Sequence, residues 1–142
     1  MKKTRVGING FGRIGRAILR INEVQDIFDV VIINELNPDN KNIAYLLEYD
    51  TTYGRFHTDV NADDTSISYA KKKIYVHHEK NIFDVPWDDY NVDIVIEASG
   101  ITDNMNAIKF NNTTTVKHFI LTHAAGEGVK TIIFGVNEHE FN

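Results

Sequence analysis

The sequence contains no cysteine, and this absence excludes several kinds of chemistry. Without thiols the 142 residues can form no disulfide, no thiolate metal site and no covalent intermediate on a cysteine. Long apolar runs are missing as well: none approaches the ~20 residues needed to span a bilayer, so we expect no membrane partner. Basic residues do not predominate, because 15 Lys and Arg stand against 20 Asp and Glu. The resulting net charge of −5 argues against a nucleic-acid partner.

Apolar residues are numerous enough for a folded core. They make up 42% of the chain, too much for a disordered protein, and the length suits one domain. The first twenty positions are rich in Lys and Arg and contain no acid, as in some organelle transit peptides. That stretch lacks serine, however, and carries a strand pattern followed by spaced glycines. No apolar segment typical of a secretory signal follows it, so a cytoplasmic location is expected.

Strand patterns alternate with helical patterns along the chain. Short apolar runs predict strands at 4–8, 29–34, 92–97, 118–122 and 131–134. Apolar positions at helical spacing predict helices at 13–23, 43–49 and 103–110, with Asn40 or Asn42 as the N-cap of the second helix. Runs at 66–70 and 74–77 look like antiparallel strands. The alternation predicts an α/β fold with a doubly wound, mostly parallel sheet, as in a Rossmann dinucleotide-binding domain.

The segment from Asn9 to Gly15 carries the clearest functional signal. It reads Asn-Gly-Phe-Gly-Arg-Ile-Gly and gives the pattern G-x-G-x-x-G between a predicted strand and a predicted helix. Gly10 permits a tight turn, Gly12 leaves room for a pyrophosphate, and Gly15 lets the helix pack closely on the strand. The pyrophosphate would then meet free N–H groups and the positive end of the helix dipole.

An acid completes this dinucleotide fingerprint. Asn34 and Glu35 end the second predicted strand, and Glu35 lies 20 residues beyond Gly15. A carboxylate there accepts hydrogen bonds from both hydroxyls of the adenosine ribose and repels a 2′-phosphate. No Arg or Lys follows before Lys41, so the predicted cofactor is NAD rather than NADP. The alternative is that Glu35 only ends a strand at the surface, and the strand, glycines and acid together disfavour it.

Several segments resemble the phosphorylating glyceraldehyde-3-phosphate dehydrogenases. Residues 5–16 are similar to the opening of that family, and Tyr-Asp-Thr-Thr-Tyr-Gly-Arg-Phe at 49–56 resembles its Tyr-Asp-Ser-Thr-His-Gly-Arg-Phe. Glu-Ala-Ser-Gly at 97–100 resembles Glu-Ser/Cys-Thr-Gly, and Gly-Val-Asn at 135–137 extends the match along the chain. The resemblance implies an NAD-binding Rossmann domain over residues 1–142. For the whole enzyme it implies a glycolytic oxidoreductase that forms a homotetramer.

The resemblance also implies further cofactor contacts. Arg13 and Ile14 would place their backbone amides over the pyrophosphate, and Lys80 would approach the adenine. Ser99–Gly100 would border the nicotinamide half, which Thr122 would line from another side. The expected cofactor-binding residues are Asn9, Gly10, Phe11, Gly12, Arg13, Ile14, Gly15, Asn34, Glu35, Lys80, Ser99, Gly100 and Thr122.

Catalysis in the resembled family needs residues that this sequence lacks. There, a cysteine thiolate activated by a histidine attacks the aldehyde, the hemithioacetal gives a hydride to NAD, and phosphate releases the acyl group. The chain has no cysteine, and none of its six histidines matches the family's catalytic histidine. We therefore expect the cofactor-binding half of the enzyme, with no catalytic residue in this chain.

Three other functions stay open. Asn-Glu-Leu at 34–36, His-Glu at 78–79 and His123 look more like the erythrose-4-phosphate dehydrogenase branch, which uses a longer aldose phosphate and water as acyl acceptor. A stand-alone NAD-binding module would carry the same fingerprint, as would a Rossmann dehydrogenase with a non-cysteine mechanism. His77 and His78 are adjacent on a predicted strand and point to opposite faces, so no metal site is expected.

Overall fold

The computed structural model describes residues 2–104, 115–124 and 126–141. These residues form a seven-stranded sheet in the order β5-β6-β7-β2-β1-β8-β9 and a separate hairpin, β3-β4. The elements are β1 (Arg5–Asn9), α1 (Arg13–Gln25), β2 (Asp29–Asn34), α2 (Asn40–Glu48), β3 (Tyr49–Asp50), β4 (Gly54–Arg55), β5 (Val60–Ala62), β6 (Ser66–Tyr69), β7 (Lys72–His77), β8 (Ile94–Glu97), β9 (His118–Leu121) and the 3-10 helix η1 (Glu138–Glu140). No helix within these ranges is both long and apolar enough to cross a membrane.

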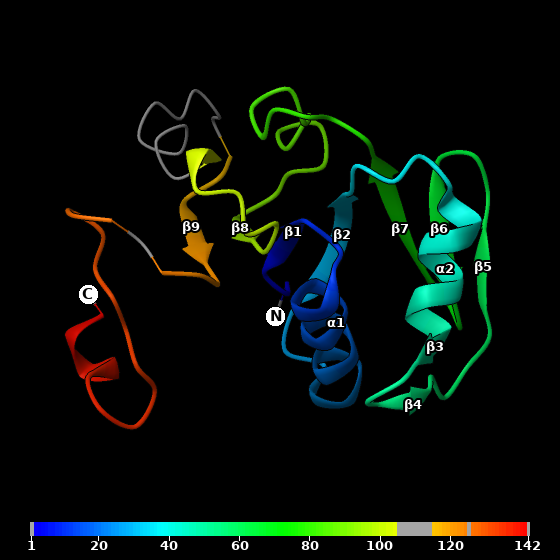
Figure 1. Ribbon diagram of the computed structural model, residues 1–142, viewed down its shortest axis with the longest axis horizontal. Coiled ribbons are helices and arrows are strands. Elements are labelled where there is room, and N and C mark those ends of the chain that lie inside the picture. Colours follow the sequence, from blue (N-terminus) through cyan, green and yellow to red (C-terminus); the bar gives the residue numbers. More distant parts are fainter. Residues whose placement is uncertain (1, 105–114, 125, 142) are drawn as a thin grey trace.

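Five neighbouring strands of the sheet are parallel. β7, β2, β1, β8 and β9 run in one direction, whereas β5 and β6 continue the sheet antiparallel beyond β7. The sheet and its helices are shown in Figure 1. The predicted α/β class and the mostly parallel sheet are therefore confirmed, as is the antiparallel pairing of the runs at 66–70 and 74–77.

Both faces of the central strands are buried. Helices α1 and α2 lie on one face, where Leu19 and Leu47 share a core cluster with Ile33 of β2 (Figure 1). The segment between β7 and β8 covers the other face, where Trp87 is 1% exposed and packs with Ile32. Because adjacent strand residues point to opposite faces, Ile32 and Ile33 enter different clusters. Burial on both faces accounts for the uninterrupted apolar sequence of β2.

Helix α2 begins three residues earlier than the predicted 43–49, and its predicted N-caps are wrong. Asp39 is the N-cap, and its carboxylate accepts from the backbone N–H groups of Lys41 (3.0 Å) and Asn42 (3.2 Å). Asn40 lies inside the helix and donates its side-chain amide to the carbonyl of Asp63 at 2.9 Å. A carboxylate just before the first turn satisfies N–H groups that the helix itself leaves unpaired.

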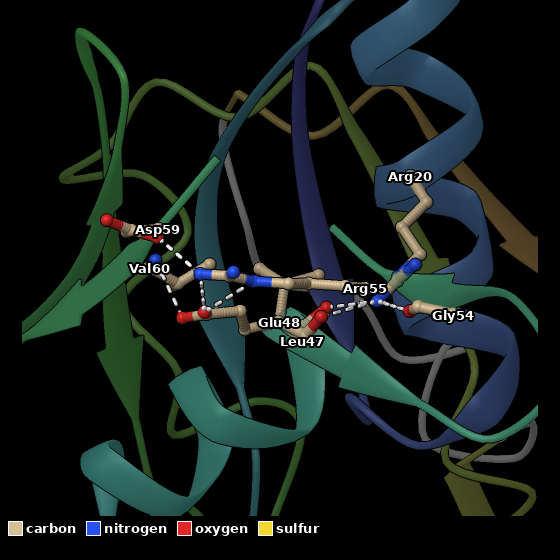
Figure 2. A network of polar contacts seen from close by, with 7 residues as sticks. All are labelled: Arg20, Leu47, Glu48, Gly54, Arg55, Asp59 and Val60. Atoms are coloured by element: carbon tan, nitrogen blue, oxygen red, sulfur yellow. Dashed lines mark hydrogen bonds and ion pairs between the residues drawn. The ribbon is translucent and has the colours of Figure 1, made fainter. Parts of the chain in front are cut away.

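A polar network joins α1, α2 and the β3-β4 hairpin, as Figure 2 shows. Arg20 of α1 donates to the main-chain carbonyls of Glu48 (3.3 Å) and Gly54 (3.1 Å). The Glu48 carboxylate accepts from the backbone N–H of Val60 (3.2 Å) and from the Arg55 guanidinium (3.0 Å). The Val60 N–H first, then the Tyr49 side chain and Arg55, hold the pKa of Glu48 below its usual value. These bonds fix the hairpin against both helices.

Near the carboxyl end, one predicted strand is absent from the described chain and one predicted helix lies mostly outside the described residues. The strand predicted at 131–134 is wrong: residues 131–133 have no regular structure and a turn follows. Ile133 is 56% exposed and Phe134 93%, so this apolar run is not built into the sheet of the described chain. The helix predicted at 103–110 lies mostly outside the described residues, although Asp103 and Asn104 are helical.

Candidate functional site

A cavity of about 160 Å³ opens at the carboxyl ends of the central strands. β1 lies between β2 and β8, so the chain builds the sheet outward from β1 first on one side and later on the other. The carboxyl end of β1 is therefore a topological switch point. Open α/β sheets bind their ligands at such points. The predicted cofactor-binding residues that line the cavity are Asn9, Gly10, Gly12, Asn34, Glu35, Lys80 and Ser99.

The glycine segment turns sharply between β1 and α1. Gly10 has φ +89°, and a Cβ there would lie 2.5 Å from the Cα of Ser99, so only glycine fits. A Cβ on Gly15 would lie 2.3 Å from the carbonyl oxygen of Gly10, so α1 packs directly on the turn. A Cβ on Gly12 would meet no atom of the described chain within 4 Å. The steric roles predicted for Gly10 and Gly15 are confirmed, and the space beside Gly12 is open.

The amino end of α1 faces this open space without a side-chain cap. Gly12 is the N-cap, and its carbonyl accepts the Arg16 N–H at 3.0 Å. In the described chain no side chain caps this end, and the first turn contains no acid. Arg13 and Ile14 occupy that turn, where helix geometry leaves backbone N–H groups unpaired. Such an end attracts an anion through its N–H groups and through the helix dipole.

Glu35 is tied to the glycine turn through its carboxylate. Oε2 accepts the backbone N–H of Phe11 at 2.8 Å, and Oε1 accepts the N–H of Asn37 at 3.2 Å. The carbonyl of Glu35 lies 2.7 Å from Nδ1 of His78, which helps to fix the backbone behind the carboxylate. The side chain of Phe11 is buried in the core. A carboxylate has about four acceptor positions, so both oxygens can still receive hydroxyl donors from the cavity.

The remaining predicted residues lie at different distances from the cavity. Lys80, which follows β7, and Ser99, which follows β8, both line the cavity. Gly100 is exposed with φ +74° and is not part of its lining in the described chain. Thr122 follows β9 and bonds the carbonyl of Glu97 through its N–H and its hydroxyl, both at 3.1 Å. The structure thus brings Lys80 and Ser99 together with the glycine turn, but not Gly100 and Thr122.

Several cavity residues were not found from the sequence. They are Leu36, Glu79, Ala98, Ile101 and Asn104. Glu97 also escaped notice as a functional candidate, although it is completely buried beneath the cavity wall. Asn104 donates to it at 2.9 Å. A sequence signal did exist: β1, β2 and β8 are apolar strands, and each ends in a polar residue.

The paired histidines have separate partners. Nε2 of His77 lies 3.0 Å from the hydroxyl of Tyr90, whereas His78 contacts the backbone of Glu35. Burial lowers the pKa of His77, because desolvation disfavours the imidazolium form. In the ranges that the structure describes, no group of three or more His, Cys, Asp or Glu residues could hold a metal ion.

Comparisons with known proteins identify the family. Residues 4–105 match the model of the glyceraldehyde 3-phosphate dehydrogenase NAD-binding domain. A chloroplastic glyceraldehyde-3-phosphate dehydrogenase of Arabidopsis thaliana is 36% identical over 140 residues, which cover 98% of this chain and 33% of that protein. Enzymes of the same name from Bacillus cereus (36% over 139 residues) and a Synechocystis strain (38% over 141) match 98% and 97% of this chain but only 41% and 42% of their own lengths. The chain therefore belongs to the family of NAD-binding domains of glyceraldehyde 3-phosphate dehydrogenase.

Proposed function

We propose that residues 1–142 bind NAD across the carboxyl ends of β1, β2 and β8, as the cofactor half of a dehydrogenase acting on an aldehyde phosphate. The observation that carries this proposal is the bond between the Glu35 carboxylate and the N–H of Phe11 at the cavity. It holds an acid suited to a ribose beside the open space at Gly12 and the uncapped end of α1.

Each half of the dinucleotide has a group of residues suited to it. The N–H groups of Arg13 and Ile14 would bind the pyrophosphate above Gly12, and Glu35 would accept the adenosine ribose hydroxyls. Lys80, on the wall of the same cavity, would approach the adenine. Ser99–Gly100 and Thr122, which follow β8 and β9, would border the nicotinamide half.

The chemistry of the whole enzyme requires groups from outside these 142 residues. NAD supplies a hydride acceptor, whereas formation of an acyl phosphate through a thioester requires a cysteine, and the chain has none. We assign this chain to cofactor binding and orientation, and the nucleophile to another part of the protein. A homotetrameric whole enzyme is part of the same proposal, because the resembled family forms one. A cytoplasmic location is proposed separately, because the first twenty residues carry a strand pattern and spaced glycines where a targeting segment would stand.

Calorimetric titration of the 142-residue chain with millimolar NAD tests the binding proposal. We expect measurable but weak binding, because the contacts at the glycine turn and Glu35 are local to this chain. Glu35→Gln should weaken binding about tenfold or more, since it removes charge-assisted hydrogen bonds. Asp64→Asn is the matched control, because Asp64 is exposed and lies on the turn between β5 and β6. No heat and no chemical-shift change with the unaltered chain would contradict the proposal.

A further inference from the structure

A row of three buried polar side chains crosses the last rung of the parallel strands. Asn9 ends β1, and its register partners are Asn34 at the end of β2 and Glu97 at the end of β8. Nδ2 of Asn34 donates to Oδ1 of Asn9 at 2.7 Å, and Nδ2 of Asn9 donates to Oε2 of Glu97 at 2.5 Å. Asn9 and Asn34 are 4% exposed and Glu97 is 0% exposed. We call these three residues the polar row.

Glu97 receives donors on both of its carboxylate oxygens. Oε1 accepts the backbone N–H of Ser99 at 2.7 Å and also its hydroxyl. Oε2 accepts the amide of Asn104 at 2.9 Å in addition to that of Asn9. These partners of the carboxylate are all donors, and no Lys, Arg or His of the described chain forms an ion pair with it.

Stability alone does not explain such a row. Burying a carboxylate has a desolvation cost that hydrogen bonds offset only in part, and well-packed apolar side chains often stabilise a protein as much or more. The neighbouring positions of β1, β2 and β8 are apolar, so an apolar rung would suit the same sheet. Unlike apolar contacts, hydrogen bonds depend on direction, so each bond of the row fixes the relative positions of two strand ends.

Every strand end held by the row leads directly into a segment of the cavity. Asn9 precedes the glycine turn, Asn34 precedes Glu35, and Glu97 is bonded to Ser99. Asn34 also exchanges two bonds with the main chain of Glu79, at 2.8 and 2.9 Å, next to the cavity residue Lys80. All four segments that line the cavity are therefore connected to one chain of buried hydrogen bonds.

We propose that Asn9 and Glu97 are positioning residues of the dinucleotide site, which hold the glycine turn, Glu35 and Ser99 at the spacing that one bound dinucleotide requires. The inference rests on the NAD binding proposed above. Binding groups must be held within about 0.5 Å of their productive places, so loss of the row should weaken dinucleotide binding even where the fold persists.

Asn9→Asp is the first test, because it keeps the shape of the side chain and replaces the donor to Glu97 by an acceptor. Two carboxylates in contact do not both stay ionised without cost, and a shared proton restores the bond between them. We expect the NAD dissociation constant of the variant to exceed that of the unaltered chain about tenfold at pH 8, and the two to converge at pH 5. The ratio at each pH cancels the contributions of Glu35, His77, His78, Glu79 and Lys80, which are the same in both proteins. Asn9 also lines the cavity, so the double variant below, which keeps the added carboxylate, separates loss of the row from direct repulsion of the ligand.

Glu97→Gln supplies a second, independent readout. One oxygen of the carboxylate becomes a donor that opposes either Asn9 or Ser99, so the β8 side of the cavity shifts. AMP spans the adenosine half only, and NAD spans both halves. We expect NAD binding to weaken at least fivefold and AMP binding to stay within twofold of the unaltered chain. General loss of fold would lower both alike, and this variant carries the test if Asn9→Asp does not fold at pH 8.

The double variant Asn9→Asp with Glu97→Gln closes the cycle. It moves the acid from β8 to β1 and reverses the bond, since the new amide at position 97 can donate to the new carboxylate at position 9. The amide of Asn104, which donates to the same atom of Glu97, then turns over and presents its oxygen as an acceptor. We expect NAD affinity to recover to within about threefold of the unaltered chain, which two independent losses would not produce. A double variant no better than the weaker single variant, or a ratio constant from pH 5 to pH 8, overturns the inference while leaving NAD binding intact. Absence of NAD binding by the unaltered chain overturns the proposed function, and the inference with it.

Discussion

Glu35 joins the end of β2 to the glycine turn through one side chain, and we propose that it selects the ligand. One oxygen is bonded to the Phe11 N–H inside the glycine turn, and the other to the Asn37 N–H after β2. The negative charge is therefore fixed at the cavity and cannot swing away from a ligand. A 2′-phosphate on the adenosine ribose would meet this fixed charge, whereas two free hydroxyls would meet an acceptor.

The double variant Glu35→Ser with Leu36→Arg should shift the preference toward NADP. It removes the repelling carboxylate and adds a guanidinium, which binds phosphate with two hydrogen bonds. Leu36 lines the cavity and is 51% exposed, so an Arg there can reach the ligand. Each change should alter the NADP/NAD affinity ratio by on the order of 1–2 kcal/mol, measured by calorimetry with both cofactors.

Leu36→Arg alone is the control for this switch. It keeps the bond from Glu35 to Phe11 and should give only part of the shift. A double variant that discriminates as the unaltered chain does would show that Glu35 is not at the ribose.

At the scale of residues, the sequence predicted the parts of the site that depend on local geometry. The steric roles of Gly10 and Gly15 follow from a turn between a strand and a helix, and the structure confirms both. The burial of Glu97 was not predicted, because it depends on a bond to Asn9 across 88 residues of sequence. Asn104 was missed for the same reason: its contact exists only after the sheet has assembled.

At the scale of elements, the packing of α1 on its preceding turn separates two requirements that one motif combines. Gly15 is needed for the approach of the helix to Gly10, whereas nothing in the described chain occupies the space beside Gly12. Replacing each glycine by alanine should therefore have different effects.

Gly15→Ala should destabilise the fold by about 1–3 kcal/mol, because its methyl group would force α1 away from the turn. Gly12→Ala should leave the free energy of unfolding within about 0.5 kcal/mol, since φ is −72° and the methyl group meets no neighbour. It should nevertheless weaken NAD binding tenfold or more, because the methyl group occupies the room predicted for the pyrophosphate. Urea unfolding and NAD titration of both variants measure the two effects. Equal losses of stability would contradict the separation.

At this scale, elements with a clear apolar pattern were predicted within a few residues. Short elements that depend on contacts with other parts of the chain were not. The uninterrupted apolar runs of β2 and β8 are visible in the sequence because both faces of these strands are buried. The two-residue strands β3 and β4 have no periodicity, and the hairpin depends on Arg20 and Glu48 from other elements. The run at 131–134 has the composition of a strand, but composition does not reveal whether a partner strand lies within reach.

At the scale of the whole molecule, the chain corresponds to about two fifths or less of the length of the relatives compared above. We expect the purified 142-residue chain to produce no NADH from glyceraldehyde 3-phosphate and phosphate, or from erythrose 4-phosphate. Without a thiolate no hemithioacetal forms, and loss of a hydride from a hydrated aldehyde lacks a positioned base. Absorbance of NADH follows the reaction, and turnover above that of a mock purification would contradict the proposal that the nucleophile lies elsewhere.

The same assay on a chain joined to a cysteine-bearing catalytic domain of the family should restore turnover. The ratio of rates with the triose and the tetrose phosphate then identifies the substrate. We expect the triose phosphate to react faster, because the relatives compared above carry that substrate in their names.

The different surroundings of the three glycines predict which of them a related domain would retain after losing its cofactor. Gly10 is constrained by its positive φ and by the backbone of Ser99, and Gly15 by the turn beneath it, so replacing either one destabilises the fold with or without a ligand. At Gly12 no neighbouring atom of the described chain excludes a side chain, so only a bound ligand would select for glycine there. A descendant that lost its cofactor would keep the first and third glycines while the second drifted to other residues. A sequence with the first and third glycines but without the second would therefore indicate a domain that keeps this fold and no longer binds a dinucleotide.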